Sequence, residues 1–279
     1  MTVVAAVPEG KYVDIFDGHK IHYHEAGEGF PVIFIHGSGP GASGWSNFKG
    51  NYETIANLAN CRCFVPDLLG YGYSSMPEEA TFTYDDLKNG IQEFAKQLGL
   101  KEYALVGNSM GGAIAITLAL ECPEQVKQLI LMAPGGLEAK EVYMEMKGIR
   151  TMIRAMYAPE GITRESMRKV FSLQLHDASL ITDDIIEERF QIAEQQPRGM
   201  FEKVIVPNQA GQLAELQMPI LGFWGVDDQF CPVSGAMIVA KEASQTKMTM
   251  LTECGHWVMV EHEAYFNQQC ADFVRQETV

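Results

Sequence analysis

The sequence predicts an α/β fold with a mostly parallel, doubly wound sheet and an inserted helical segment. Short, almost fully apolar runs alternate with longer runs whose apolar residues recur at helical spacing, as expected for parallel strands covered by helices. From about 137 to 209 the strand-like runs nearly vanish and helical patterns dominate. We therefore expect a first core part at 1–136, a helical lid at 137–209 and a second core part at 210–279.

The core parts contain the predicted elements in alternation. The first two strands flank a turn signal at Asp17-Gly18, and Thr83 is a plausible N-cap for a helix at 83–99. Further helices are expected at about 48–58, after Ser109, and at 234–243 and 263–275. The predicted strands are 11–16, 20–26, 31–37, 61–67, 102–108, 125–136, 218–225 and 247–253.

Composition and charge limit the classes of partner. The chain has 279 residues, 47% of them hydrophobic and 20% charged, which argues against disorder. A formal net charge of −15 argues against nucleic acid or an anionic membrane as a partner. The six cysteines form no C-x-x-C pair and no apolar stretch approaches ~20 residues. We therefore expect free thiols and a cytoplasmic protein.

A serine stands between two glycines where a predicted strand meets a predicted helix. In Gly107-Asn108-Ser109-Met110-Gly111 the glycines allow a tight turn that exposes the serine oxygen at the carboxyl edge of the sheet, as in the G-x-S-x-G nucleophile elbow. The alternative is that the serine only caps the following helix. The order of strand, turn and helix favours a catalytic serine.

Two more residues follow in the order that a serine nucleophile requires, first an orienting acid and then a histidine base. Asp228 lies just beyond the predicted strand 218–225, and His256 just beyond the strand 247–253. Ligands bind at the carboxyl ends of strands in open α/β sheets, so these side chains are expected to meet Ser109 there. Taken singly, the alternatives are an ordinary buried histidine and a loop acid that caps the next helix.

A glycine-rich loop, HGSGPG at 36–41, follows the predicted strand 31–37. It resembles the HGGG-type loop that supplies one donor of an oxyanion hole. A tetrahedral intermediate needs preorganised N–H donors, and the backbone N–H groups of Ser38 and Met110 are the expected ones. The alternative is a glycine-rich turn without this role.

One charged residue of the predicted lid stands on an apolar helix face. In the predicted helix 182–196, Thr182 is the expected N-cap, and Arg189 lies four residues after Ile185 and three before Ile192. A buried guanidinium without a partner is costly, so Arg189 needs an anion. That anion is either an acidic side chain of the lid or a substrate carboxylate held bidentately.

These motifs resemble the α/β-hydrolase fold over essentially the whole chain. Within that fold they resemble the meta-cleavage product hydrolases, the carbon–carbon bond hydrolases of bacterial aromatic catabolism. Val226 and Gln229 depart from the family, which often has basic residues at these positions beside the acid. The matching stretches are HGSGPGASGWSNF at 36–48, VGNSMGGA at 106–113, LILMAPGGL at 129–137, WGVDDQF at 224–230 and CGHWVMVEH at 254–262.

The resemblance implies a role for each residue of the site. Asp227 is implied to be the non-catalytic neighbour of the acid, and Arg189 to engage the dienoate end of the substrate. Alternatives are core packing for Trp257, helix capping for Asn47 and a turn role for Asn108. The implied triad is Ser109, Asp228 and His256. The implied substrate contacts are Asn47, Asn108, Arg189 and Trp257.

The implied reaction is the hydrolysis of a 2-hydroxy-6-oxo-hexa-2,4-dienoate to 2-hydroxypenta-2,4-dienoate and a carboxylic acid. The dienol must ketonise before Ser109 attacks the 6-carbonyl, because a carbon leaving group needs an electron sink. One alternative is a carboxylesterase or thioesterase with the same triad, and another is a ligand-perceiving receptor on this fold. A dehalogenase or epoxide hydrolase would need a carboxylate where Ser109 stands.

The remaining expectations concern partners and the substrate pocket. No metal or organic cofactor is expected, since the histidines and carboxylates show no convincing metal-ligand spacing. The family resemblance implies a small-molecule dienoate as substrate and a homo-oligomer, a dimer or larger. The pocket for the 6-substituent is expected to be lined by Met144, Met152, Met156 and Phe171.

Overall fold

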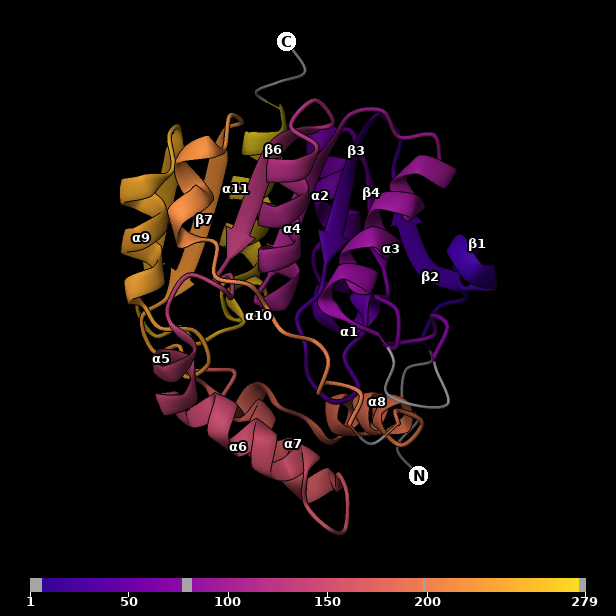
Figure 1. Ribbon diagram of the computed structural model, residues 1–279, viewed down its shortest axis with the longest axis vertical. Helices are drawn as coiled ribbons and strands as arrows, with labels where there is room; N and C mark the ends of the chain where they lie inside the picture. Colours follow the sequence, from indigo (N-terminus) through magenta and orange to yellow (C-terminus); the bar gives the residue numbers. More distant parts are fainter. Residues whose placement is uncertain (1–6, 77–81, 198, 276–279) are drawn as a thin grey trace.

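The computed structural model describes residues 7–76, 82–197 and 199–275, and these build one twisted sheet (Figure 1). Its strand order is β1-β2-β4-β3-β5-β6-β7-β8. The β1–β2 and β2–β4 pairs are antiparallel, and all pairs from β4 to β8 are parallel. The predicted mostly parallel α/β sheet is therefore confirmed. The strands are β1 (Lys11–Asp14), β2 (Lys20–Ala26), β3 (Phe30–Ile35), β4 (Cys61–Pro66), β5 (Tyr103–Asn108), β6 (Val126–Met132), β7 (Ile220–Gly225) and β8 (Thr246–Leu251).

Both faces of the central strands, β3 to β7, are buried, and successive residues of a strand point to the two faces in turn. In β3, Ile33 and Ile35 belong to the core under α3 (Tyr84–Gln97), α4 (Met110–Glu121) and α9 (Ser234–Glu242). Val32 and Phe34 belong to the core on the other face, which the two remaining long helices of this part cover. Those helices are α2 (Tyr52–Ala59) and α11 (Glu263–Arg275).

Most predicted helices are found close to their expected positions. Thr83 caps α3, since its side chain accepts a hydrogen bond from the Asp86 backbone N–H. The helix expected at about 48–58 is found as α2, but its expected start is wrong, because α1 (Gly44–Phe48) ends there and α2 begins at Tyr52. The break between them is held by tertiary contacts: the Asn51 side chain donates hydrogen bonds to Met259 O and Asn267 Oδ1.

The regular structure of the segment between β6 and β7 is helical, with loops between the helices and no strand among its described residues. In Figure 1 its helices gather beyond the end of the sheet toward which the parallel strands point. This is the end at which open α/β sheets bind ligands. No helix formed by the described residues is long and apolar enough to cross a lipid bilayer. The helices of the segment are α5 (Lys140–Glu145), α6 (Lys147–Met156), α7 (Arg164–Phe171) and α8 (Asp183–Ala193).

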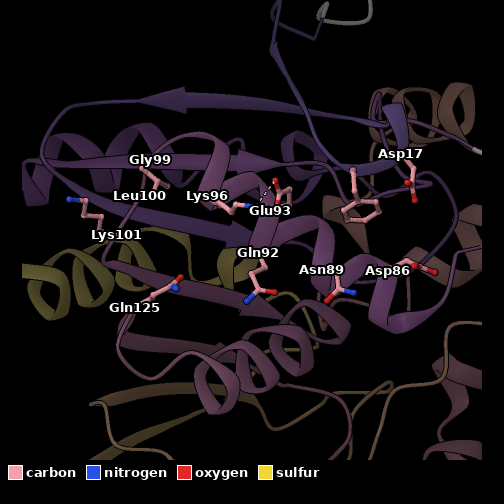
Figure 2. A pocket seen from close by; sticks show the side chains of 11 residues that line it. Asp17, Asp86, Asn89, Gln92, Glu93, Lys96, Gly99, Leu100, Lys101 and Gln125 are labelled. Atoms are coloured by element: carbon pink, nitrogen blue, oxygen red, sulfur yellow. Dashed lines mark hydrogen bonds and ion pairs between the residues drawn. The ribbon is translucent and has the colours of Figure 1, made fainter.

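A wide polar groove of about 920 Å³ runs along the outer face of α3 (Figure 2). Side chains of both charges border it, and Lys96 pairs with Glu93 across one turn of the helix. None of the residues singled out as a catalytic or substrate contact borders this groove. The chemistry that the motifs predict therefore belongs elsewhere, at the carboxyl edge of the sheet.

The contact between α4 and β3 leaves no room for a side chain at Gly111. A Cβ added there would lie 2.1 Å from the Ile35 backbone oxygen and 2.5 Å from that of His36. We expect Gly111→Ala to lower the free energy of unfolding by about 2–3 kcal/mol, because backbone atoms must shift to admit the methyl group. Urea unfolding measures this difference.

A matched control is Gly211→Ala in the 3-10 helix Ala210–Glu215, where an added Cβ meets nothing within 4 Å. Its unfolding free energy should stay within about 0.5 kcal/mol of the wild type. Equal losses for the two substitutions would contradict the predicted backbone clash at Gly111.

Candidate active site

Ser109 occupies a strained turn between β5 and α4. Its backbone has φ 55° and ψ −119°, in a region that a residue with a Cβ adopts only at a cost of about 1–3 kcal/mol. The turn is tight because Gly107 lies against the next helix turn: a Cβ there would be 2.5 Å from the Gly111 oxygen. The Ser109 side chain makes no capping hydrogen bond, so the alternative that it only caps α4 is wrong.

Asp228 and His256 come together beyond the ends of β7 and β8. The distance between His256 Nδ1 and Asp228 Oδ2 is 2.7 Å, and both side chains are almost fully buried. The other carboxylate oxygen accepts hydrogen bonds from the backbone N–H groups of Phe230 at 2.7 Å and Cys231 at 2.9 Å. Asp228 therefore orients the histidine, and it does not cap the next helix.

This pairing determines which nitrogen of His256 is available as a base. An ionised carboxylate only accepts hydrogen bonds, so Nδ1 carries the proton and Nε2 keeps its lone pair. Ser109 and His256 line the same cavity, and no hydrogen bond joins their side chains among the described residues. In sites without substrate the contact between nucleophile and base is often long, and it tightens when substrate binds.

Asp227 has a different environment from its neighbour. Its Oδ2 lies 2.8 Å from His176 Nδ1, and both side chains are nearly half exposed. The two adjacent acids are therefore separated by burial, with Asp228 inside the site and Asp227 at the surface.

The glycine-rich loop after β3 lies directly against the elbow. A Cβ added to Gly37 would be 3.2 Å from Ser109 Cβ and 3.1 Å from Asn108 Oδ1. Ser38, the next residue, lines the cavity. Met110 is the first residue of α4, so its backbone N–H has no acceptor within the helix. The loop and the helix start that carry the two expected oxyanion donors therefore lie side by side.

Arg189 is buried in the cavity wall without a carboxylate partner among the described residues. Its Nη2 donates a hydrogen bond of 2.7 Å to Asn47 Oδ1, and its guanidinium carbon lies 4.7 Å from the Trp257 ring centroid and 5.0 Å from that of Phe171. The adjacent acid, Glu188, pairs instead with Lys49. The interpretation of Arg189 as half of an internal ion pair is therefore wrong.

Burial has the expected electrostatic effect on this arginine. It lowers the pKa of Arg189 to about 10, although the charge of Glu188 acts in the opposite direction. The group therefore remains a cation at neutral pH. Its Nε is buried and has no hydrogen-bond partner among the described residues. The wall thus presents a buried positive charge with an unused donor.

The two asparagines have defined places in the wall. Asn108 is buried beside Ser109, and its Nδ2 donates a hydrogen bond of 3.3 Å to Met132 O. Asn47 is buried in α1 and holds the Arg189 guanidinium instead of capping a helix. Both side chains line the cavity together with Trp257.

The enclosed cavity is small, with a volume of about 20 Å³. That is room for about one water molecule. Met152 and Ile149 of α6 close it from the segment beyond the sheet. A substrate larger than water therefore needs these side chains to move, and methionine is flexible enough to do so.

The expected pocket lining is only partly right. Met152 lines the cavity, but Met144 is 40% exposed and Met156 borders a separate surface pocket. Phe171 is buried and packs under the Arg189 guanidinium. Helical periodicity predicts which face of a helix is buried. It does not predict whether that face borders the cavity, because this depends on how the helices are placed relative to one another.

Three residues of the site were not predicted from the sequence. The Phe230 ring stacks on His256 with ring centroids 5.4 Å apart, and Gln174 lines the cavity. The Cys231 thiol lies beside the Ser109 hydroxyl, and burial raises its pKa well above the ordinary value. The one available signal was the isolated polar Gln174 between Leu173 and Leu175. No group of three or more His, Cys, Asp or Glu side chains in the described part of the chain is arranged to hold a metal ion.

His36 fixes the start of the glycine-rich loop as a neutral ring. Its Nδ1 donates to Gly37 O at 2.8 Å and its Nε2 accepts from the Leu68 backbone N–H at 3.0 Å. Burial lowers its pKa from 6.5 to about 4, against the opposing effect of the nearby Asp67 charge. The folded protein therefore keeps His36 neutral at a pH where the unfolded chain protonates it.

We expect this histidine to make the protein less stable as the pH falls below 6.5. Above pH 6.5 the ring is neutral in both the folded and the unfolded state, so it does not change the free energy of unfolding. Between pH 6.5 and 4 only the unfolded state takes up the proton, so the free energy of unfolding decreases as the pH falls. At pH 5 the loss is about 2 kcal/mol. Urea unfolding at pH 7 and pH 5 should show a smaller loss in His36→Gln than in the wild type. Equal losses would contradict this assignment.

Comparison with known proteins places the chain among hydrolases. A family model described as the alpha/beta hydrolase fold matches residues 31–263. The chain is 32% identical over 268 residues to the 2-hydroxy-6-oxo-6-phenylhexa-2,4-dienoate hydrolase of Comamonas testosteroni, covering 92% of this chain and 91% of that protein. It is 34% identical over 267 residues to a 2-hydroxy-6-oxononadienedioate/2-hydroxy-6-oxononatrienedioate hydrolase of the same species, covering 91% of each.

The solved structures agree. The meta-cleavage product hydrolase of Pseudomonas fluorescens IP01 superposes with a TM-score of 0.82 at 27% identity, covering 96% of this chain and 98% of that one. The fold, the order of the motifs and the full-length similarity point to one family. The chain belongs to the meta-cleavage product hydrolases of the α/β-hydrolase fold.

Proposed function

We propose that the protein hydrolyses the C5–C6 bond of 2-hydroxy-6-oxo-hexa-2,4-dienoates, with Ser109, Asp228 and His256 as its catalytic triad. The products are 2-hydroxypenta-2,4-dienoate and the carboxylic acid that carries the 6-substituent. The relatives whose names specify a substrate act on 2-hydroxy-6-oxo-dienoates with different 6-substituents, which supports this substrate class.

The observation that carries the proposal is the buried guanidinium of Arg189. A cation removed from water needs an anion or several hydrogen-bond acceptors, and Asn47 supplies one neutral acceptor. The carboxylate of a dienoate would complete this pairing in a bidentate geometry. A neutral ester offers no such group, so Arg189 favours the dienoate over the carboxylesterase or thioesterase alternative.

In the first step the dienol becomes a ketone. His256 Nε2 takes the proton of the 2-hydroxyl group and C5 is protonated, which gives the 2-oxo form. Arg189, Asn47 and the Asn108 amide hold the oxygens at this end of the substrate. The conjugated ketone can then accept the electron pair of the bond that breaks.

In the second step Ser109 attacks the 6-carbonyl carbon while His256 takes the hydroxyl proton. The Ser38 and Met110 N–H groups stabilise the oxyanion. When the tetrahedral intermediate collapses, the C5–C6 bond breaks, its electron pair flows into the conjugated ketone, and the 2-oxygen takes the proton from His256, which releases the hydroxydienoate and leaves His256 neutral. Water, activated by His256, then hydrolyses the acyl-enzyme.

We propose that residues 137–209 act as the lid of this site. Their helices lie beyond the carboxyl ends of the strands, and they supply Arg189, Met152 and Gln174 to the cavity wall. A cytoplasmic location and a dimer or larger assembly remain predictions, and sedimentation velocity of the purified protein tests the second.

The first test follows the loss of dienolate absorbance with the ring-fission products of catechol, 3-methylcatechol and 2,3-dihydroxybiphenyl. We expect Ser109→Ala to abolish turnover. We expect Arg189→Ala to lower kcat/KM for the dienoates by roughly 10²–10³-fold, because the substrate carboxylate loses its buried partner. Hydrolysis of 4-nitrophenyl acetate should fall less than about 10-fold in Arg189→Ala.

The matched control is Arg164→Ala, which removes an exposed arginine of α7 that pairs with Glu187. Its kcat/KM values should stay near those of the wild type. Turnover of the ester alone, with equal sensitivity to both arginines, would show that the protein is an esterase and not a dienoate hydrolase.

A second test uses Asp228→Asn. The amide would donate to His256 Nδ1 and force the proton onto Nε2, so the base would be lost while the geometry is kept. We expect kcat to fall by about 10⁴-fold, with circular dichroism unchanged. A fall of less than tenfold would contradict the role of Asp228.

A further inference from the structure

Gln174 joins the catalytic histidine loop to the cavity. It follows α7, and its backbone oxygen accepts hydrogen bonds from the N–H groups of His256 at 2.7 Å and Trp257 at 3.2 Å. The residue is 5% exposed and is one of those that border the cavity. The backbone of Gln174 therefore has a structural role, while its side-chain oxygen, beside the cavity, is left without a hydrogen bond from any described residue.

The carboxamide of Gln174 has no partner within the described part of the chain. Its Oε1 is fully buried without a hydrogen bond, and its Nε2 donates none there. If the amide oxygen and nitrogen exchange places, the buried atom still has no hydrogen-bond partner, because the carboxamide has an acceptor at one end and donors at the other. A buried amide without partners destabilises the protein. It is therefore retained at a cost, and the cavity is the place from which a partner would come.

That partner is not Arg189. The guanidinium is enclosed by Asn47 and by the rings of Trp257 and Phe171, and no hydrogen bond joins it to Gln174. Arg189 and the asparagines already provide polar groups for the dienoate oxygens. Gln174 is thus an additional polar group in the wall, attached to the histidine loop whose ring stacks on Phe230.

Three other residues of the wall, Ile149, Met152 and Phe230, are apolar. With Arg189 and the asparagines assigned to the dienoate end, we infer that this hydrocarbon surface is left for the part of the substrate beyond the 6-carbonyl. An unsubstituted alkyl or aryl group placed there would leave the Gln174 amide buried and unpaired. A group that carries a hydroxyl or another hydrogen-bonding oxygen would pair with it.

We propose that Gln174 determines specificity and selects dienoates whose 6-substituent carries a neutral hydrogen-bonding group. This inference rests on the proposed function. In the acyl-enzyme the 6-substituent remains attached to the carbonyl on Ser109, so the amide acts on the acyl half of the reaction. The same contact therefore exists when the acyl group arrives from an ester, which gives an independent test.

The experiment compares two substituents of nearly equal size, propyl and 2-hydroxyethyl, at C6 of the dienoate. The same acyl groups are supplied as 4-nitrophenyl butanoate and 4-nitrophenyl 3-hydroxypropanoate. The wild type should prefer the hydroxyethyl member of each pair. Gln174→Met should reduce the ratio of kcat/KM for hydroxyethyl over propyl by roughly 10- to 100-fold in both pairs.

Gln191→Met, which replaces an exposed glutamine of α8, is the matched control and should leave both ratios unchanged. An equal loss for both members of each pair in Gln174→Met would overturn the proposal and leave Gln174 a positioning residue for the His256 loop. Ester turnover without dienoate turnover would overturn the proposed function, and the ester pair would still decide the role of Gln174. Absence of all turnover would overturn both.

Discussion

The close contact between the β3 backbone and the first turn of α4 is the constraint on which the site depends. It admits no side chain at Gly111, and it presses Gly37 against Ser109. The neighbouring structure therefore holds Ser109 at φ 55°, a conformation that the residue would not keep by itself. The same contact sets the loop that carries Ser38 against the turn that precedes Met110, so one packing arrangement orients the proposed nucleophile and brings together the segments with the expected oxyanion donors.

Electrostatics determine how the rest of the site is used. Asp228 is saturated by two backbone N–H groups and His256, so its charge is stabilised in place and the histidine is held as one tautomer. Arg189 is the opposite case, a buried cation with one neutral acceptor. The site therefore combines a buried anion behind His256 whose hydrogen bonds are satisfied with a buried cation in the cavity wall whose charge is unpaired among the described residues, and this contrast supports the proposed roles of the two groups.

Much of this arrangement could be predicted from the sequence, because it is encoded locally. Ser109 and Asp228 follow apolar runs typical of parallel strands and His256 follows a shorter, partly polar strand, and parallel strands end at one edge of a sheet. The Thr182 cap and the helix face of Arg189 also follow from spacing of a few residues, and α8 begins and is buried accordingly. Predictions failed where contacts between distant segments determine the local structure. One example is the break between α1 and α2, where the Asn51 side chain donates a hydrogen bond to Asn267 of α11.

The sequence by itself determined the class of sheet, the order of the reactive residues and the presence of an arginine on an apolar helix face, since these depend on periodicity and on neighbours along the chain. Only the tertiary structure decided which side chains reach the cavity. Met144 lies at the surface, whereas Gln174 borders the cavity. Glu188 pairs with Lys49, so Arg189 has no carboxylate partner among the described residues. Such choices depend on how helices pack across the end of the sheet, and packing between distant segments leaves no mark in local sequence.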